Sequence, residues 1–521
     1  MSNTPEATAT AEHGSAKSYI LLFVLALAPR LYLLRVFGIE LSNDGFDAVR
    51  TLTIVQTSGM GALPRDLVDR FILHPLYMAL LGVLRAVTPT SLDFFLVARL
   101  LSALLGCLAV LVMFVLVRSA LDEVSAWGAA LLLAYAPTFL WESVAILSST
   151  LFLTLYLLVI LSLWRKSYRW ASLLAALSAL TRYEGIVLLL LVTLALAARG
   201  VRGRRALRGD WAFHAAMVLA FPAAILCAGY LATGDFTQAV GAQSMASIWL
   251  RFFAPSEFLQ RASFFLTRYS SLFPNVVVWL GVLGCVVTAR RQPRFFALLA
   301  LASALYLLFF EALVWLNYTT LEVRFLMYPG LPLLPFAGAA LSAAGSLFSS
   351  LWLLRPWERW RRFVVAASLL ALLVVSYRQS IPGIRFVYTM HATQEQVATE
   401  LSRFVPARQK TQVMIYAGVS GALDMFARQR DLDLSFSFFR FVPDGQVEQF
   451  LIDKQVQFMI YPVGNAFASA KYPYLSRAEE QDRGGVHFAP LAQFTTQPDG
   501  QVYVIWRVTP IADGSNSAPG S

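Results

Sequence analysis

Two aspartates in the N-terminal part of the chain are the first residues whose types and spacing suggest catalysis. Asp44 and Asp47 lie in the segment SNDGFDAVR (42–50), directly after the first long apolar block. At a separation of three residues their side chains share one face of a helical turn. One carboxylate can act as a general base, and two can also hold a divalent cation. The competing interpretation is structural, with Asn43 or Asp44 capping a helix at a membrane interface.

The turn TRYEG (181–185) places an arginine and a glutamate at the end of another apolar block. The guanidinium of Arg182 offers paired hydrogen bonds to a phosphate, with Tyr183 and Glu184 beside it. Glu142 follows a tryptophan at a block end predicted to lie at the same depth, where it can pair with an arginine. The alternative for both segments is an ordinary membrane boundary with polar side chains reaching the headgroups.

A third segment, NYTTLEVRFLMYP (317–329), combines Glu322 and Arg324 ahead of a long apolar block with Tyr328 inside its first turns. An arginine at a lipid boundary again suits a phosphate group. The same chemistry applies to Arg30, which lies within the first apolar block. A guanidinium there requires an anionic partner, either a protein group or a lipid phosphate.

His74 shares a loop with the two aspartates and begins the amphipathic run HPLYMALLGVLRAV (74–87). The length and polarity of this run predict a helix that lies along the membrane interface. A lone histidine is usually structural, so its position beside the acidic segment is what makes His74 a candidate.

These residues need apolar helices to position them, and the composition supplies such helices. The chain has 521 residues, of which 58% are hydrophobic and 14% charged, and its mean hydropathy is +0.61. The apolar residues form blocks of about 17–25 residues, the length at which a helix crosses a bilayer. We therefore predict a polytopic α-helical membrane protein with about eleven transmembrane helices. The predicted spans are 19–37, 94–117, 124–141, 144–164, 168–181, 185–199, 212–232, 272–289, 294–312, 325–350 and 363–379.

The net charge of +11 comes largely from arginines in every second loop between these blocks. Such loops are cytoplasmic under the positive-inside rule. This rule accounts for the positive charge, so we infer no nucleic-acid partner from it. The N-terminus is then cytoplasmic and the C-terminus external, in the inner or plasma membrane of a cell. All candidate site residues fall on the external side.

The chain after residue 380 has a different pattern. Three short apolar runs, at 411–418, 456–462 and 502–508, predict buried strands in a small α/β domain. We find no glycine-rich phosphate loop or metal-ligand spacing there, which favours a lid or docking module. The predicted organisation is a disordered N-terminus (1–18), a transmembrane domain (19–380) with a first external loop (38–93), an extracytoplasmic α/β domain (381–510) and a disordered tail (511–521).

The sequence resembles the GT-C glycosyltransferases, in particular the protein O-mannosyltransferase superfamily that includes the lipid A aminoarabinose and galacturonic acid transferases. Five segments in the same order carry the resemblance. They match an acidic motif after the first span, an HPPLY run, an RLPSALxG segment, a TRxEG turn and an RYxLPxxP stretch. Here they read NDGFD (43–47), HPLY (74–77), ARLLSALLG (98–106), TRYEG (181–185) and VRFLMYPGLPLL (323–334). The first has Asn43 where two adjacent acids are more usual, and the second lacks one proline.

The resemblance implies transfer of a sugar from a polyprenyl-phosphate-sugar donor to an acceptor hydroxyl on the external face, with inversion. It implies Asp44 or Asp47 as the base, with no cofactor required beyond a possible divalent cation. The residues it implies around the lipid phosphate are Arg30, His74, Arg182, Tyr183, Glu184, Arg324 and Tyr328. Glu142 and Glu322 are supporting carboxylates, and Asp235 and Glu257 are candidates for a second family carboxylate. The acceptor, whether lipid, glycan or protein, stays open.

Two other functions remain open at this point. A transporter or flippase of lipid-linked sugars would use the same arginines for phosphate headgroups, although we find no repeat between the halves of the chain. A catalytically inactive relative would use the external domain to bind a glycan or a partner protein.

Overall fold

The computed structural model describes most of the chain, which forms two compact units. The first unit comprises Met1–Gly38 and Thr51–Gly383, and the second comprises Ile39–Arg50 and Ile384–Ser521. The residues not described are 1–4, 39, 41, 60, 62–73, 90, 201–206, 234–271, 316–322, 352–356, 416–422, 424–425, 428, 439–445, 464–472, 497–499 and 512–521.

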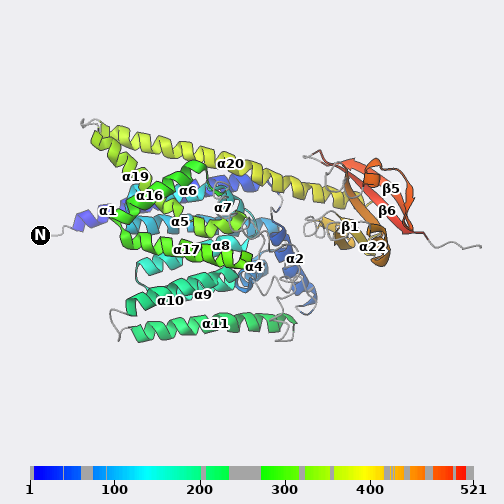
Figure 1. Ribbon diagram of the computed structural model, residues 1–521, viewed down its shortest axis with the longest axis horizontal. Helices are drawn as coiled ribbons and strands as arrows, with labels where there is room; N and C mark the ends of the chain where they lie inside the picture. Colours follow the sequence, from blue (N-terminus) through cyan, green and yellow to red (C-terminus); the bar gives the residue numbers. More distant parts are fainter. Residues whose placement is uncertain are drawn as a thin grey trace, which may run out of the picture. The chain divides into compact units, whose positions relative to one another are not determined.

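The first unit is built from helices (Figure 1). Its helices are α1 (Pro5–Val36), α4 (Pro75–Val87), α5 (Phe94–Ala120), α6 (Glu123–Ala134), α7 (Pro137–Glu142), α8 (Ser148–Trp164), α9 (Tyr168–Thr181), η2 (Tyr183–Gly185), α10 (Ile186–Gly200), α11 (Leu207–Thr233), α16 (Asn275–Arg291), α17 (Pro293–Trp315), η4 (Val323–Leu326), α18 (Met327–Gly330) and α19 (Leu333–Leu351). Two more helices belong partly to each unit: α2 (Asn43–Ser58) and α20 (Trp357–Leu401).

Each predicted span lies mostly in helix, in agreement with a polytopic α-helical membrane protein. Five described helices are long and apolar enough to cross a membrane, at Ala16–Val36, Phe94–Ala120, Arg208–Leu231, Pro293–Ala312 and Met327–Leu347. The total of eleven therefore stays a prediction.

Two boundaries differ from the sequence prediction. The predicted span 124–141 is interrupted, because α6 ends at Ala134 and α7 begins at Pro137. Ala136 is extended (φ −61°, ψ 128°), the conformation that a following proline favours. The first helix begins at Pro5, within the N-terminal segment for which the sequence predicted disorder.

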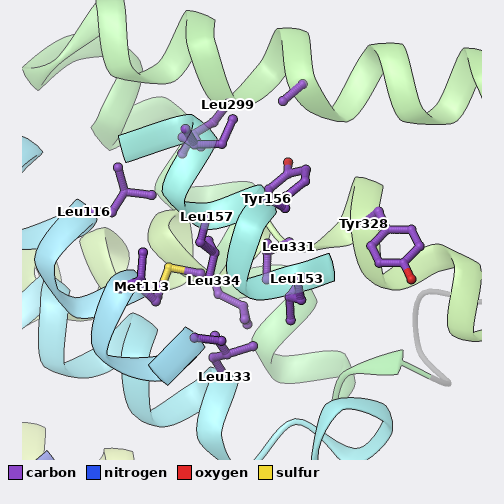
Figure 2. Packing of buried hydrophobic residues seen from close by; sticks show 14 of the residues in the cluster. Met113, Leu116, Leu133, Leu153, Tyr156, Leu157, Leu299, Tyr328, Leu331 and Leu334 are labelled. Carbon is purple, nitrogen blue, oxygen red and sulfur yellow. The ribbon is translucent and has the colours of Figure 1, made fainter. Parts of the chain in front are cut away.

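The core of the first unit lies among α5, α6, α8, α17 and α19. Figure 2 shows Met113 and Leu116 from α5 packing with Tyr156 and Leu157 from α8 and with Leu334 from α19. The three residues from α5 and α19 are at most 1% exposed, as are the two from α8. Since lipid is as apolar as leucine, such close packing, more than a hydrophobic driving force, holds the helices together.

Small and polar residues set the contact between α6 and α19. The carboxylate of Asp122 accepts the backbone N–H of Ser125 at 2.9 Å and caps α6. The same carboxylate accepts the hydroxyl of Ser342 on α19 at 3.1 Å. Gly338 of α19 packs directly against the backbone of Ser125, an approach that no larger residue allows. A single aspartate thus caps the start of α6 and joins this helix to α19.

The second unit contains a six-stranded sheet in the order β2-β1-β3-β6-β5-β4. Figure 1 labels β1, β5 and β6 of this sheet together with α22. Strand β1 is parallel to β2 and β3, while β6 is antiparallel to β3 and β5, and β4 is antiparallel to β5. The strands are β1 (Lys410–Ile415), β2 (Asp433–Phe438), β3 (Phe458–Val463), β4 (Gln481–Arg483), β5 (Val486–Thr495) and β6 (Val502–Pro510). Helix α22 (Val447–Asp453) packs on the sheet through Val447 and Leu451, against a core that includes Tyr461 and Trp506.

The predicted C-terminal α/β domain is confirmed, with β1, β3 and β6 at the three predicted runs. Strands β2, β4 and β5 were not predicted, because their alternating or polar residues lack a continuous apolar run. Nor did any sequence pattern indicate that residues 39–50, which carry the two aspartates, belong to the same compact unit as this sheet.

Candidate functional site

Arg182 and Glu184 form a buried ion pair at the end of α9. Arg182 Nη2 lies 2.7 Å from Glu184 Oε1, and Nε lies 3.2 Å from both carboxylate oxygens. Arg182 is 5% exposed and Glu184 is fully buried. Arg182 Nη1 donates to the hydroxyl of Ser148, at the start of α8, at 3.2 Å. The carboxylate therefore fixes one edge of the guanidinium, and Ser148 fixes its tip.

The local sequence explains this geometry. Helix α9 ends at Thr181, Arg182 is extended (φ −154°, ψ 139°), and residues 183–185 form the single 3₁₀ turn η2. The extended residue ends the helix, and the turn that follows brings the carboxylate of Glu184 within 2.7 Å of the guanidinium two residues earlier. Gly185 packs against the backbone of Ser178 and Ala179 at the end of α9, which leaves no room for a Cβ atom.

His74 lies beside the same turn although it is 107 residues away in the sequence. Its Nδ1 is 2.9 Å from the carbonyl oxygen of Thr181. Because a carbonyl only accepts hydrogen bonds, Nδ1 carries the proton and donates. Pro75 then occupies the first turn of α4, where its missing N–H costs nothing. The structure thus places His74 at the turn that carries Arg182 and Glu184.

Tyrosines and phenylalanines pack near this pair. The ring of Tyr328, on α18, lies 4.8 Å from Phe152 and 5.8 Å from Tyr306, and Tyr306 lies 5.5 Å from Tyr156. Figure 2 shows Tyr156 and Tyr328 at one side of the leucine core. Among the described residues, the buried hydroxyls of Tyr156 and Tyr306 have no hydrogen-bond partner. Neither Tyr156 nor Tyr306 was among the candidates predicted from the sequence, where their only signal is a phenol inside an apolar block.

The predicted site residues Tyr183 and Glu142 contact other parts of the first unit. The ring of Tyr183, in η2, lies 6.3 Å from that of Phe309 on α17. Glu142 is 2% exposed at the end of α7, and its backbone carbonyl accepts the hydroxyl of Thr150 at 3.1 Å. Both residues therefore pack against other helices of the protein, unlike side chains that reach into the lipid headgroups.

Arg30 is enclosed by protein. It is fully buried, donates from Nη1 to the carbonyls of Ala26 at 2.6 Å and Ala134 at 3.3 Å, and lies 5.2 Å from the centre of the Phe139 ring. Gly106 makes room for it, since a Cβ there would lie 3.0 Å from Arg30 Nε. In the described part of the chain, Nε and Nη2 have no hydrogen-bond partner.

A second buried arginine, Arg99 on α5, was missed by the sequence analysis. Its Nε donates to the carbonyl of Val144 at 2.8 Å, and its Nη2 donates to the carbonyl of Phe37 at 2.8 Å. Arg99 therefore fixes the chain just after α1, where the acidic segment follows. Its signal was present in the ARLLSALLG segment, but nothing in that segment indicates which carbonyls the arginine binds.

The acidic segment lies in the second unit. Asp47 is 8% exposed and Asp44 is half-buried, both in the part of α2 that belongs to this unit. The hydroxyl of Ser42 accepts the N–H of Gly45 at 3.2 Å, so Ser42 fills the capping role that the alternative interpretation gave to Asn43 or Asp44. The Nδ1 atom of His391, on α20, lies 2.6 Å from the backbone carbonyl oxygen of Glu40.

Several predicted residues cannot be placed. Glu322, Asp235 and Glu257 lie outside the described residues, and so does the side chain of Arg324 in η4. Within the described chain, no group of three or more His, Cys, Asp or Glu residues is arranged to hold a metal ion.

Comparison with solved structures identifies the architecture. No protein-family model and no curated protein matches the sequence. The structure of ArnT from Cupriavidus metallidurans bound to undecaprenyl phosphate matches 96% of this chain and 100% of that chain, at 15% identity and a TM-score of 0.51. The Archaeoglobus fulgidus oligosaccharyltransferase in its apo form matches 93% of this chain and 74% of that one, at 14% identity and a TM-score of 0.54. The chain has the GT-C fold. A third match, to the same oligosaccharyltransferase tethered to an acceptor peptide, has 13% identity and a TM-score of 0.52.

Within this GT-C fold, the geometry gives two groups of candidates, each inside one unit. The first unit holds a cationic site of Arg182, Glu184, Ser148 and His74, with Tyr328 packed nearby. The second unit holds the acidic segment with Asp44 and Asp47.

Replacing Gly185 by alanine is expected to destabilise this GT-C chain by about 3 kcal/mol, near the upper end of what overpacking costs. The added methyl group would overlap backbone atoms of Ser178 and Ala179, which cannot rotate away. Thermal unfolding in detergent measures the loss. Gly82→Ala in α4 is the matched control, because its Cβ would lie 3.7 Å from the nearest atom, a side-chain carbon of Leu52. Equal unfolding temperatures for the two variants would contradict the tight turn.

A second prediction concerns pH. Burial lowers the pKa of His391 from its usual 6.5 to about 4, against a smaller opposite effect of the Glu40 carbonyl. Between pH 6.5 and about 4, His391 is therefore protonated in the unfolded chain but neutral in the folded chain. Stability should fall by up to about 3 kcal/mol as the pH drops from 6.5 to 4, and no further below that from this residue. Melting temperatures measured from pH 4 to 7 should fall less in His391→Asn than in the unaltered protein.

Proposed function

We propose that this protein transfers a sugar from a polyprenyl-phosphate-sugar donor to an acceptor hydroxyl on the external side of the membrane. The observation that carries the proposal is the guanidinium of Arg182, held in a fixed orientation by Glu184 and Ser148 next to His74. The neighbours with this fold support it, since one was solved with undecaprenyl phosphate and another with an acceptor peptide.

The chemistry of Arg182 favours a phosphate ligand. A guanidinium has five N–H groups, and among the described residues Glu184 and Ser148 accept from Nε, from one N–H of Nη2 and from one N–H of Nη1. One N–H group on each of Nη1 and Nη2 is left for a ligand, and phosphate oxygens accept such a pair. Glu184 also lowers the free-energy cost of burying the cation, so Arg182 can stay charged in the absence of a ligand.

The proposed reaction is a single displacement. The acceptor oxygen forms a bond to the anomeric carbon, the bond from that carbon to the phosphate oxygen breaks, and the configuration inverts. Asp44 or Asp47 takes the proton of the acceptor hydroxyl as general base. Negative charge develops on the departing phosphate, where Arg182 stabilises it electrostatically. Arg324 and Arg30 are the further cations that the sequence predicts for this phosphate.

The proposal depends on a lipid-linked donor, so the test uses one. The purified protein, reconstituted in lipid vesicles, is given a series of undecaprenyl-phosphate-sugars together with candidate acceptors. We expect release of undecaprenyl phosphate, detected by mass spectrometry, and a loss of that release in Arg182→Gln. Lipid-linked sugars that accumulate in cells after deletion of the gene would identify the natural donor. Movement of the intact lipid-linked sugar across the vesicle membrane, without any glycosyl product, would instead establish a transporter.

A further inference from the structure

His391 is a fully buried side chain of α20 that no part of the proposed reaction uses. Its Nδ1 lies 2.6 Å from the backbone carbonyl of Glu40, the residue that begins the described acidic segment. The carbonyl cannot donate, so Nδ1 carries the ring proton and Nε2 is left as an acceptor. Burial keeps the imidazole neutral, which allows this single tautomer. The ring is thus a fixed hydrogen-bond donor to the backbone of the acidic segment.

The same ring contacts the segment a second time. Phe46 packs edge-on against His391 with ring centres 5.1 Å apart, and Phe46 also lies 5.6 Å from Phe426. Aromatic contacts of this geometry add to the stability gained from burial alone. His391 therefore binds the segment at Glu40 through the backbone and at Phe46 through a side chain.

Asp44 lies between these two attachment points, and Asp47 follows the second. The backbone between them includes Gly45, the residue type that loses the most conformational freedom when it is fixed. Ser42 fixes one bond within the segment, through the N–H of Gly45. The backbone carbonyl of Ser42 also accepts the N–H groups of Gly45 and Phe46, at 3.1 and 3.2 Å. Ser42 therefore closes the first turn of α2, and His391 adds a hold on the residues at either side of Asp44.

We propose that His391 is a positioning residue, which holds the segment from Glu40 to Asp47 in the one conformation that presents its carboxylates for proton transfer. The catalytic part of this inference rests on the proposed function, whereas the structural part does not. It also assigns a task to the C-terminal unit: the helix leading into the sheet fixes the geometry of a predicted catalytic segment. Misplacing a reacting group by about 1 Å can cost about a hundredfold in rate.

A matched pair of variants isolates the hydrogen bond. The amide nitrogen of asparagine can take the place of Nδ1, whereas that of glutamine reaches only as far as Nε2. In full-length protein in detergent, we expect amide hydrogen exchange in the peptide covering residues 40–50 to be about tenfold faster in His391→Gln, the effect of losing one buried hydrogen bond. His391→Asn keeps the hydrogen bond but loses the ring contact with Phe46. Its exchange should therefore be slower than in His391→Gln, though faster than in the unaltered protein. Turnover should follow the same order, with kcat lowered in His391→Gln and the KM for the lipid donor unchanged.

Gln394→Met is the control for disturbing this helix face. Gln394 is fully buried one turn away from His391, and its amide atoms have no hydrogen-bond partner among the described residues. Its replacement should leave both exchange and kcat unchanged. If His391→Gln does not fold, Phe46→Leu removes the second attachment and should likewise speed exchange at residues 40–50.

The outcomes separate the two proposals. Unchanged exchange in His391→Gln, or equally fast exchange in His391→Asn, would overturn the positioning role whatever the enzyme does. Faster exchange in His391→Gln with partial rescue in His391→Asn supports the hold on the segment even if no sugar transfer is found. Exchange that changes while kcat stays constant would overturn the catalytic part.

Discussion

Replacing Glu184 by alanine will destabilise the protein by about 3–5 kcal/mol, the usual cost of removing one partner of a buried ion pair. The carboxylate is fully buried, and Arg182 is only 5% exposed. Its removal leaves a guanidinium inside the protein with no counter-charge from its nearest acid. The cost arises from the stranded cation more than from the lost attraction, since taking a charge out of water is expensive.

This explanation can be separated from a simple loss of packing. The double variant Arg182→Met/Glu184→Met removes both charges and keeps much of the volume. It should be more stable than Glu184→Ala, because no charge is left buried. Both are measured by thermal or denaturant unfolding in detergent, with the two single methionine variants completing the cycle.

A surface ion pair in the same unit provides the control. Asp210 lies 3.2 Å from Arg169 and 3.4 Å from Arg199, whose side chains are 67% and 42% exposed. Solvent screens such pairs, so Asp210→Ala should cost no more than about 1 kcal/mol. If Glu184→Ala loses as little stability as Asp210→Ala, then removing Glu184 does not leave Arg182 as a buried, unpaired charge, and the prediction is wrong.

Asp44→Asn is expected to lower kcat by about 10²–10⁴, the range that general-base catalysis contributes. Asparagine has nearly the same shape as aspartate but cannot take a proton at neutral pH. Asp44 is half-buried in the first turn of α2, and Ser42 caps that turn, so the fold should survive the change. The measurement is release of undecaprenyl phosphate under saturating donor and acceptor.

Asp47→Asn is the comparison that distinguishes the two carboxylates. Asp47 is 8% exposed, so its replacement should act more on unfolding temperature than on kcat if Asp44 is the base. Asp93→Asn serves as a control for the chemical change itself. Asp93 caps α5 by accepting the N–H of Phe95 at 3.0 Å, a role that asparagine fills equally well. Full turnover in both Asp44→Asn and Asp47→Asn would remove the proposed base.

Much of the fold follows from local sequence patterns. Apolar blocks of membrane-spanning length produced helices, because a chain in lipid must satisfy its backbone internally. The apolar runs in the C-terminal unit produced β1, β3 and β6 for a related reason, since buried strands are apolar on both faces. The turn at 181–185 also followed from the sequence, because it lies between two apolar blocks, whereas the pairing of Arg182 with Glu184 and the close packing of Gly185 did not.

The contacts that build the candidate sites did not follow from these patterns. His74, Arg99 and His391 each bind a backbone carbonyl far away in the sequence, at Thr181, at Phe37 and Val144, and at Glu40. Every residue has such a carbonyl, so the residue type does not indicate which carbonyl a buried arginine or histidine binds.

The sequence by itself therefore determined most of the helices, the three apolar strands β1, β3 and β6, and which side chains are able to hold phosphate or take a proton. Only the tertiary structure decided that His74 lies beside the turn of Arg182, that Tyr156 and Tyr306 pack near Tyr328, and that the acidic segment joins the C-terminal unit. The physical reason is that hydropathy and residue type act locally, whereas these neighbours are selected by shape and by backbone acceptors that all residues share.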